Sequence, residues 1–248
     1  MTERAIARLV LVGSVIVDIV LYVEALPERG GDVVASRSMT TAGGGFNVLS
    51  AAARQGLPSA YGGLVGTGPF GAQVRDALTA ESVPLLLPGP AVGLDTGFCV
   101  AMVEASGERT FATTVGAEAG LTDDLLASLG VGAGDAVYVS GYDLVYPHGP
   151  AIVSWLSRLP EDVVVVLDPG PLVADIPAGL LETVLARLTW LSLSVREAAQ
   201  LTGATDPESV ARTVFERSPS LSDLVVRDGP GGCDVYSRSG TAEHVGAP

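Results

Sequence analysis

The sequence predicts an α/β protein with three layers, in which helices cover both faces of a mostly parallel central sheet. Short apolar runs without polar interruption alternate along the chain with longer stretches of helical character. Such runs, bounded by helices, are typical of strands that are buried on both faces. Hydrophobic residues make up 48% of the chain and aromatic residues only 5%, which indicates an aliphatic core.

Six apolar runs are the expected strands of this sheet, and each ends in glycine, aspartate or serine. In chain order they read "RLVLVG", "AYGGLVG", "DAVYVSG", "DVVVVLDPG", "LTWLSLS" and "DLVVRDG". Ligands of open parallel sheets bind at the carboxyl ends of the strands. The residues that directly follow these runs are therefore the first candidates for a functional site.

Seven stretches between the strands are the expected helices. Thr122 and Asp206 are suitable N-cap residues, and Gly56 and Gly203 are suitable helix ends. The helices are expected over residues 47–55, 70–82, 122–129, 149–159, 177–188, 195–202 and 207–217. At 248 residues the chain is long enough for a single large domain, which we expect to span residues 1–248.

Two β-rich segments interrupt the alternation, at about residues 21–41 and 98–114. The second contains Ser106-Gly107 between two β-rich arms, which predicts a hairpin. Together they suggest a small extra β layer that covers a site as a lid or pairs with a second copy of the chain in a homodimer. Edge strands without such a role fit the pattern equally well.

Charge and composition exclude several classes of partner and chemistry. The formal net charge is −14, whereas nucleic acids and anionic membranes require a basic surface. The chain has no lysine, so a G-x-x-x-x-G-K-[ST] phosphate loop and Schiff-base chemistry are excluded. The apolar stretch over residues 9–23 is too short to span a bilayer. These features predict a soluble, cytoplasmic protein.

The cysteines and histidines are isolated from one another in sequence. Cys99, Cys233, His148 and His244 form no pair with the spacing of a metal site, so a zinc site is not expected. We expect these four residues to be structural or on the surface, in a reducing compartment.

The glycine-rich stretch "TTAGGGFNVLSAAARQG", residues 40–56, is the most distinctive segment. Its glycines precede an expected helix, whose first N–H groups can bind an anion. The spacing is not G-x-G-x-x-G, however, and no acidic residue follows at the position that a dinucleotide site requires. This disfavours a dinucleotide-binding oxidoreductase.

An ordered series of motifs resembles the PfkB family, the ribokinase-like carbohydrate kinases. The series runs through "GSVIVD", "GGGFNVLSAAARQG", "YGGLVGTGPFGAQVRDAL", "DTGFCVAMVEASGERTF", "GAEAGLT", "VYVSGY", "LDPGP", "LSLSVREAAQLTG" and "LVVRDGPGGCDVY". The resemblance covers nearly the whole chain. It implies a ribokinase-like fold and phosphorylation of a hydroxymethyl group on a sugar or nucleoside, with ATP and Mg²⁺.

The same resemblance implies a site for the phosphoryl acceptor at the glycine-rich stretch. Asp18 would accept a hydrogen bond from an acceptor hydroxyl, although a turn or cap role also fits this residue. Ile16 stands where a ribokinase has a polar sugar contact, so the resemblance does not specify ribose. The residues assigned to the acceptor are Asp18, Gly43, Gly44, Gly45 and Asn47.

On the nucleotide side the match to the family is less complete. Ser194-Val195 occupies the place of the family's Asn-Glu pair, and Glu197 falls where the family keeps a glutamate linked to Mg²⁺ through water. Arg227 either pairs with phosphates or is a solvated surface arginine. The residues assigned to the nucleotide are Ser194, Arg227, Asp228, Gly229, Gly231 and Gly232.

The family signature D-T-x-G-A-G-D, which supplies the catalytic aspartate and an anion hole, has no match. Gly132-Ala133-Gly134-Asp135 spells G-A-G-D but leads into an expected strand, so we expect Asp135 to be a turn residue. The catalytic aspartate is expected beyond Pro248, and residues 1–248 alone are expected to be inactive. The alternative is a non-catalytic protein that binds a sugar or nucleoside.

Overall fold

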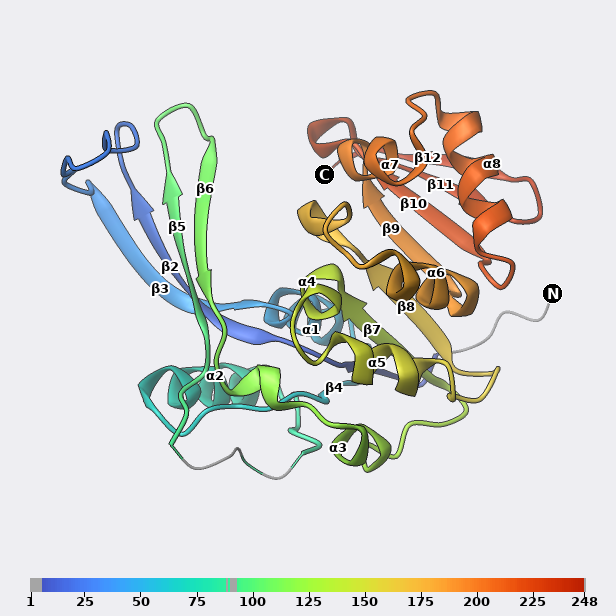
Figure 1. The fold of residues 1–248 in the computed structure, drawn as a ribbon, viewed down its shortest axis with the longest axis horizontal. Coiled ribbons are helices and arrows are strands. Elements are labelled where there is room, and N and C mark those ends of the chain that lie inside the picture. Colours follow the sequence, from blue (N-terminus) through green and yellow to red (C-terminus); the bar gives the residue numbers. More distant parts are fainter. Residues whose placement is uncertain (1–5, 88, 90–92, 248) are drawn as a thin grey trace. The chain divides into compact units, whose positions relative to one another are not determined.

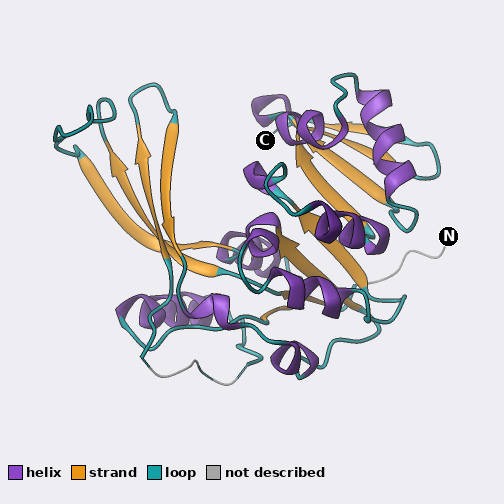
Figure 2. Cartoon of the chain, viewed as in Figure 1, coloured by secondary structure: helices purple, strands orange, loops and turns teal. Residues whose placement is uncertain are grey.

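The computed structural model describes residues 6–87, 89 and 93–247, which group into two compact units (Figures 1 and 2). The large unit contains residues 6–12 and 121–247, and the small unit contains residues 13–120.

The large unit is built on a mixed, mostly parallel sheet. Its strands are β1 (Arg8–Leu11), β7 (Asp135–Ser140), β8 (Val164–Asp168), β9 (Trp190–Ser194), β10 (Asp223–Arg227), β11 (Cys233–Ser237) and β12 (Ala242–Val245). They lie in the order β12-β11-β10-β9-β8-β7-β1. The pairs from β1 to β10 are parallel, and β10–β11 and β11–β12 are antiparallel. The expected α/β architecture is confirmed.

The helices of the large unit connect the parallel strands. They are α3 (Asp123–Ala127), α4 (Gly141–Val145), α5 (Gly149–Leu156), α6 (Ala178–Arg187), α7 (Val195–Thr202) and α8 (Pro207–Arg217), with short 3₁₀ turns η2 (Gly170–Leu172) and η3 (Gly229–Gly231). Thr122 and Asp206 cap α3 and α8 by accepting backbone N–H groups, as expected. Gly203 ends α7 in the left-handed conformation.

Two strands of this sheet were not expected from the sequence. After the run "DLVVRDG", the chain turns back through η3 and forms β11 and β12 beside β10. All residues of β11 are partly exposed and all residues of β12 are exposed, so neither strand carries the continuous apolar pattern of a buried strand. The pattern of hydrophobicity therefore gives no signal for them.

The small unit consists of a four-stranded sheet with helices at its base. Its elements are β2 (Val15–Tyr22), β3 (Arg37–Gly44), α1 (Phe46–Arg54), β4 (Ser59–Tyr61), α2 (Pro69–Ala80), β5 (Phe98–Val103), β6 (Arg109–Thr114) and the 3₁₀ turn η1 (Ala117–Gly120). The sheet has the order β3-β2-β5-β6, and Figure 1 shows these strands as one curved layer. The expected hairpin is present, because β5 and β6 pair antiparallel around Gly107.

The bounds of the small β layer differ from those that the sequence suggested. β2 begins at Val15 and belongs to this layer along its whole length, and β3 begins only at Arg37. The expected strand "AYGGLVG" is reduced to β4, which contains only its first two residues, Ala60 and Tyr61. A Cβ atom at Gly63 would overlap the Gly13 carbonyl and the Tyr61 hydroxyl.

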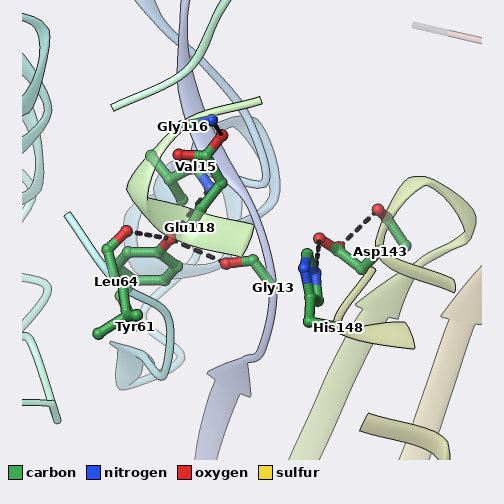
Figure 3. Close-up of polar contacts among 9 residues, drawn as sticks. Gly13, Val15, Tyr61, Leu64, Gly116, Glu118, Asp143 and His148 are labelled. Atoms are coloured by element: carbon green, nitrogen blue, oxygen red, sulfur yellow. Dashed lines mark hydrogen bonds and ion pairs between the residues drawn. The ribbon is translucent and has the colours of Figure 1, made fainter. Parts of the chain in front are cut away.

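Two acidic side chains, one buried and one partly buried, hold the base of this layer. The fully buried Glu118 accepts the N–H group of Gly97 at 3.0 Å and that of Gly116 at 2.7 Å, and so joins the start of β5 to the end of β6. Figure 3 shows the contact with Gly116. Asp95 accepts the N–H groups of Phe70 and Gly71 and thereby caps α2, whose own N-cap residue has no side chain. These carboxylates satisfy backbone donors that burial would otherwise leave unpaired.

The G-A-G-D sequence has a structural role in the large unit. Asp135 is the first residue of β7, and its carboxylate forms a two-point contact with Arg8, at 3.0 and 2.7 Å. Burial raises the pKa of Asp135, but the Arg8 hydrogen bond and the Gly132 N–H outweigh it, and the pKa lies below its ordinary value. The sequence G-A-G-D leads into a strand, as expected, but Asp135 is the first residue of that strand rather than a turn residue, and it ties β7 to β1.

We predict that Asp135→Asn lowers the free energy of unfolding at pH 7 by about 1–3 kcal/mol, because it removes a charge-assisted pair. A carboxyl whose folded pKa is lowered stabilises the protein above its unfolded pKa, and this contribution is lost as pH falls through the folded value. The difference between variant and wild type should therefore begin to shrink at about pH 4, the ordinary pKa of a carboxyl group, and vanish only below the lowered pKa of folded Asp135. Denaturant unfolding at several pH values measures it, with the exposed Asp162→Asn as the control. A difference independent of pH would contradict the assignment.

Candidate functional site

The small unit places Asp18 in the middle of β2, paired with Thr41 of β3 and Cys99 of β5. Asp18 thus lies within a strand and not in a turn or at a helix cap. Its carboxylate lies over the Cα atom of Gly43, where any Cβ atom would overlap it. A side chain at position 43 would therefore displace the Asp18 carboxylate from this position.

The Asp18 carboxylate has no hydrogen-bond partner among the described residues, although it is partly buried. Burial raises the pKa of Asp18 above its ordinary value. A partly buried carboxylate without donors is costly to the folded protein, and a ligand hydroxyl would relieve that cost. The structure thus brings Asp18 and Gly43 together as the resemblance implies.

The remaining glycines connect β3 to α1. Gly44 has φ +59, a conformation that favours glycine, and Gly45 is the N-cap residue of α1 and donates its N–H to the Ser14 carbonyl at 3.0 Å. Asn47 lies in the first turn of α1 with an exposed side chain. It makes no hydrogen bond to Asp18 among the described residues.

A residue that the sequence analysis missed fixes the start of β2. Tyr61 is fully buried, and its hydroxyl accepts the Val15 N–H at 3.1 Å and donates to the Gly13 carbonyl at 2.8 Å (Figure 3). The strand that carries Asp18 is therefore anchored three residues before it. Only the short run "AYGG" marks Tyr61 in the sequence, and nothing in that run distinguishes it from an ordinary core tyrosine.

In the large unit, charged side chains gather at the carboxyl ends of neighbouring strands. Asp168 ends β8, Arg227 ends β10, and Glu197 lies in the first turn of α7, directly after β9. The Arg227 guanidinium lies 2.9 Å from the Asp168 carboxylate and 3.4 Å from that of Glu197. Arg227 is thus neither isolated nor purely a surface residue, because two carboxylates hold it.

Asp168 is a member of this cluster that the sequence analysis did not assign. Burial raises its pKa, Arg227 opposes that rise, and the pKa stays above its ordinary value. The signal was present in "LDPG", where an aspartate directly follows a buried strand. Asp-Pro-Gly is also an ordinary turn sequence, so this run alone does not distinguish a site residue from a turn residue.

Ser194 and Glu197 form a reciprocal cap at the start of α7. The Ser194 hydroxyl accepts the Glu197 N–H at 3.2 Å, and the Glu197 carboxylate accepts the Ser194 N–H at 2.7 Å. The predicted nucleotide turn is η3 with its flanks, where Asp228 and Gly232 are joined by a 2.8 Å backbone hydrogen bond. Asp228, Gly229 and Gly231 are exposed.

The residues of this edge fit a hydrated Mg²⁺ better than a metal held by the protein alone. No group of three metal-ligating side chains exists among the described residues. Mg²⁺ usually keeps several waters and contacts one or two carboxylates. Asp168 and Glu197 are two carboxylates of that kind, and Oε2 of Glu197 is already used by Ser194 and Arg227.

The histidines have separate surroundings. His148 is buried, and its Nε2 lies 3.3 Å from the Asp143 carboxylate, which also accepts the Ser140 hydroxyl at 2.8 Å (Figure 3). His244 is exposed and contacts Asp234.

No helix within the described ranges has the length and apolar character needed to cross a bilayer.

Residues 6–248 match the family described as pfkB family carbohydrate kinase, and the chain belongs to this family. A curated relative, the uncharacterized sugar kinase YegV of Escherichia coli, is 35% identical over 189 residues. That match covers 76% of this chain and 58% of the relative's length.

Solved structures confirm the ribokinase-like fold. A ribokinase from Giardia lamblia has a TM-score of 0.78 at 21% identity and covers 98% of this chain and 75% of its own. A ribokinase from Thermotoga maritima has a TM-score of 0.77 at 19% identity, with 97% and 77% covered. An Arabidopsis thaliana ribokinase, complexed with ribose and ATP, has a TM-score of 0.69 at 21% identity, with 97% and 78% covered.

Proposed function

We propose that this chain binds a sugar or nucleoside at Asp18 and ATP at the strand ends of the large unit, for transfer of the γ-phosphoryl group to a hydroxymethyl group. The observation that carries the proposal is the Asp18 carboxylate, which is partly buried, has no donor among the described residues, and lies over Gly43. Membership of a carbohydrate kinase family supports it.

The acceptor is proposed to bind through its hydroxyl groups. The ionised Asp18 accepts a hydrogen bond from one hydroxyl, and a charge-assisted bond of this kind is stronger than a neutral one. Gly44, which is exposed, and the partly exposed Gly45 are proposed to let the acceptor approach the backbone beside the Asp18 carboxylate, which itself covers Gly43. Asn47 offers an exposed amide that can both donate and accept.

The nucleotide is proposed to bind along Ser194, Arg227 and the turn over residues 228–232. Arg227 already contacts two carboxylates and is 44% exposed, so it can exchange part of this contact for a phosphate. Asp168 and Glu197 would hold water molecules of a bound Mg²⁺. The positive charge of the ion would reduce the repulsion among the phosphate groups of the nucleotide. An ATP-bound and an ADP-bound ribokinase among the similar structures support nucleotide binding.

The proton acceptor of the transfer is not assigned to any of the 248 residues, because none of them lies in a D-T-x-G-A-G-D sequence. We propose that residues 1–248 alone bind both ligands but transfer phosphate slowly. Loss of a general base or of an anion hole each costs about 10²-fold or more in rate. If a chain that also contains a D-T-x-G-A-G-D segment binds both ligands but transfers no phosphoryl group, the result would favour the alternative, a non-catalytic protein that binds a sugar or nucleoside.

The proposal also includes a homodimer and a cytoplasmic location. A homodimer through the β layer would cover the edges of β3 and β6, which pair with no further strand within the described ranges. The small-molecule chemistry and the acidic charge suit a cytoplasmic enzyme that does not bind nucleic acid.

We predict that Asp18→Ala weakens acceptor binding by about 1.5–3 kcal/mol, because a charge-assisted hydrogen bond is lost. Binding to the wild type should weaken as pH falls, starting at a higher pH than for an ordinary carboxyl group, because the pKa of Asp18 is raised. Calorimetry with a panel of sugars and nucleosides measures both effects. The exposed Thr40→Ala is the control, and equal affinities for Asp18→Ala and wild type would refute the assignment.

We predict that Arg227→Gln weakens ATP binding by about tenfold or more and leaves acceptor binding unchanged, because a phosphate loses a charged donor. Arg227→Lys should restore part of the affinity. Fluorescence titration with an ATP analogue measures it, beside Arg212→Gln as the control. If Arg227→Gln binds ATP as the wild type does, Arg227 serves only to neutralise Asp168 and Glu197.

A further inference from the structure

His148 is a fully buried histidine in the large unit, at the junction between α4 and α5. Its Nε2 atom lies 3.3 Å from an oxygen of the Asp143 carboxylate, and because such an oxygen only accepts, we assign the ring proton to Nε2. The other ring nitrogen, Nδ1, is buried without a hydrogen-bond partner among the described residues. An apolar side chain would fill this position without leaving a nitrogen unpaired, so packing alone does not account for a histidine here.

The Asp143 carboxylate joins His148 to the end of β7 (Figure 3). It is 1% exposed, and its second oxygen accepts the Ser140 hydroxyl at 2.8 Å. Ser140 is the last residue of β7 and the N-cap residue of α4, but its hydroxyl bonds to Asp143 and does not cap the helix. Because α4 has only five residues, its own hydrogen bonds cannot hold it, and its position depends on contacts of this kind.

The helix α5, which begins directly after His148, is the fixed support of this group. It packs against α3 and α6 and buries one side in the core, through Ile152, Val153, Trp155 and Leu156. Its first residue, Gly149, approaches α4 so closely that a Cβ atom there would overlap the backbone carbonyl of Leu144. His148 therefore connects the short helix α4 to a helix that is anchored in the core.

The first residue of α4 packs on the turn that follows β8. A Cβ atom at Gly141 would overlap the backbone carbonyl of Pro169, so the two backbones are in direct contact. In the same turn, Gly170 donates its N–H to the Asp168 carboxylate at 3.1 Å. The strand register also aligns Ser140 with Asp168. A shift of α4 would therefore move this turn and change the position of the Asp168 carboxylate.

We propose that His148 is a positioning residue for the carboxylate that faces Mg²⁺: through Asp143 it holds α4, and α4 holds the turn that carries Asp168. This inference rests on the proposed function, in which Asp168 holds water molecules of Mg²⁺. Removal of a group that orients the ligands of a metal typically lowers the affinity for the metal about 10- to 100-fold. His148 acts through Asp143 and touches neither the metal nor the nucleotide. Its loss should therefore affect chiefly the part of ATP binding that depends on Mg²⁺.

The test measures the affinity of the 248-residue chain for a fluorescent ATP analogue, once with Mg²⁺ and once with EDTA in its place. His148→Leu removes the Nε2 donor and keeps an apolar side chain in the core. It should weaken binding about tenfold with Mg²⁺ and change it by less than about twofold with EDTA. His148→Gln keeps an N–H donor that reaches Asp143 and should retain most of the affinity.

Val153→Ala is the control for a loss of stability alone. It removes buried methyl groups from α5 without touching the Asp143 contact, so it should lower the stability and leave both affinities unchanged. If His148→Leu does not fold, as judged by circular dichroism, Ser140→Ala decides instead. That variant removes only the hydroxyl donor of Asp143, and it should cause a smaller loss that is again confined to binding with Mg²⁺.

The inference is overturned if Mg²⁺ does not strengthen ATP binding to the wild type, or if His148→Leu (or Ser140→Ala in its place) binds with Mg²⁺ as the wild type does. It is also overturned if the loss is equal with and without Mg²⁺, if His148→Gln is no better than His148→Leu, or if Val153→Ala causes the same loss. In these cases Arg227-dependent ATP binding still stands, and with it the proposed function. If ATP binding does not depend on Arg227, the proposed nucleotide site itself fails.

Discussion

The close approach of the Asp18 carboxylate to the Gly43 backbone is the constraint on which the proposed acceptor site depends. The carboxylate keeps this position only while residue 43 has no side chain and β2 and β3 keep their register, because a slip by one residue would turn Asp18 to the face on which α2 packs. Tyr61 fixes the start of β2, and Glu118 joins β5 to β6. The small unit therefore holds a partly buried carboxylate in place without giving it a donor from the described residues.

The proposed nucleotide site depends on the arrangement of the parallel strands in the large unit. Parallel strands bring their carboxyl ends to one edge, so Asp168, Glu197 and Arg227 meet although the chain separates them widely. The arginine neutralises two carboxylates whose repulsion would otherwise oppose folding. An arginine that is already desolvated in part and shared between two acids can contact phosphate at a smaller cost than one that is fully hydrated.

Much of the large unit could be predicted, because its parallel strands are continuous apolar runs and its helices carry recognisable caps. β11 and β12 could not, since half-exposed strands lack that pattern. The family resemblance assigned Asp18 and Gly43 to the acceptor site, but it did not explain why residue 43 is a glycine. That explanation lies in a contact between two strands, β2 and β3. The roles of Asp168 and Tyr61 could not be predicted either, because their partners are distant in sequence. Asp168 contacts Arg227, and Tyr61 contacts the backbone of residues 13 and 15.

The most direct test of the account is a double-mutant cycle on Gly43 and Asp18. Gly43→Ala should displace the carboxylate and weaken acceptor binding about as much as Asp18→Ala, whereas ATP binding stays unchanged. In the Asp18→Ala background, adding Gly43→Ala should cost little more, because the contact is already gone. Gly179→Ala, at a position where a Cβ atom meets nothing within 4 Å, is the control. Wild-type acceptor affinity in Gly43→Ala, or equal losses in both backgrounds, would contradict the account.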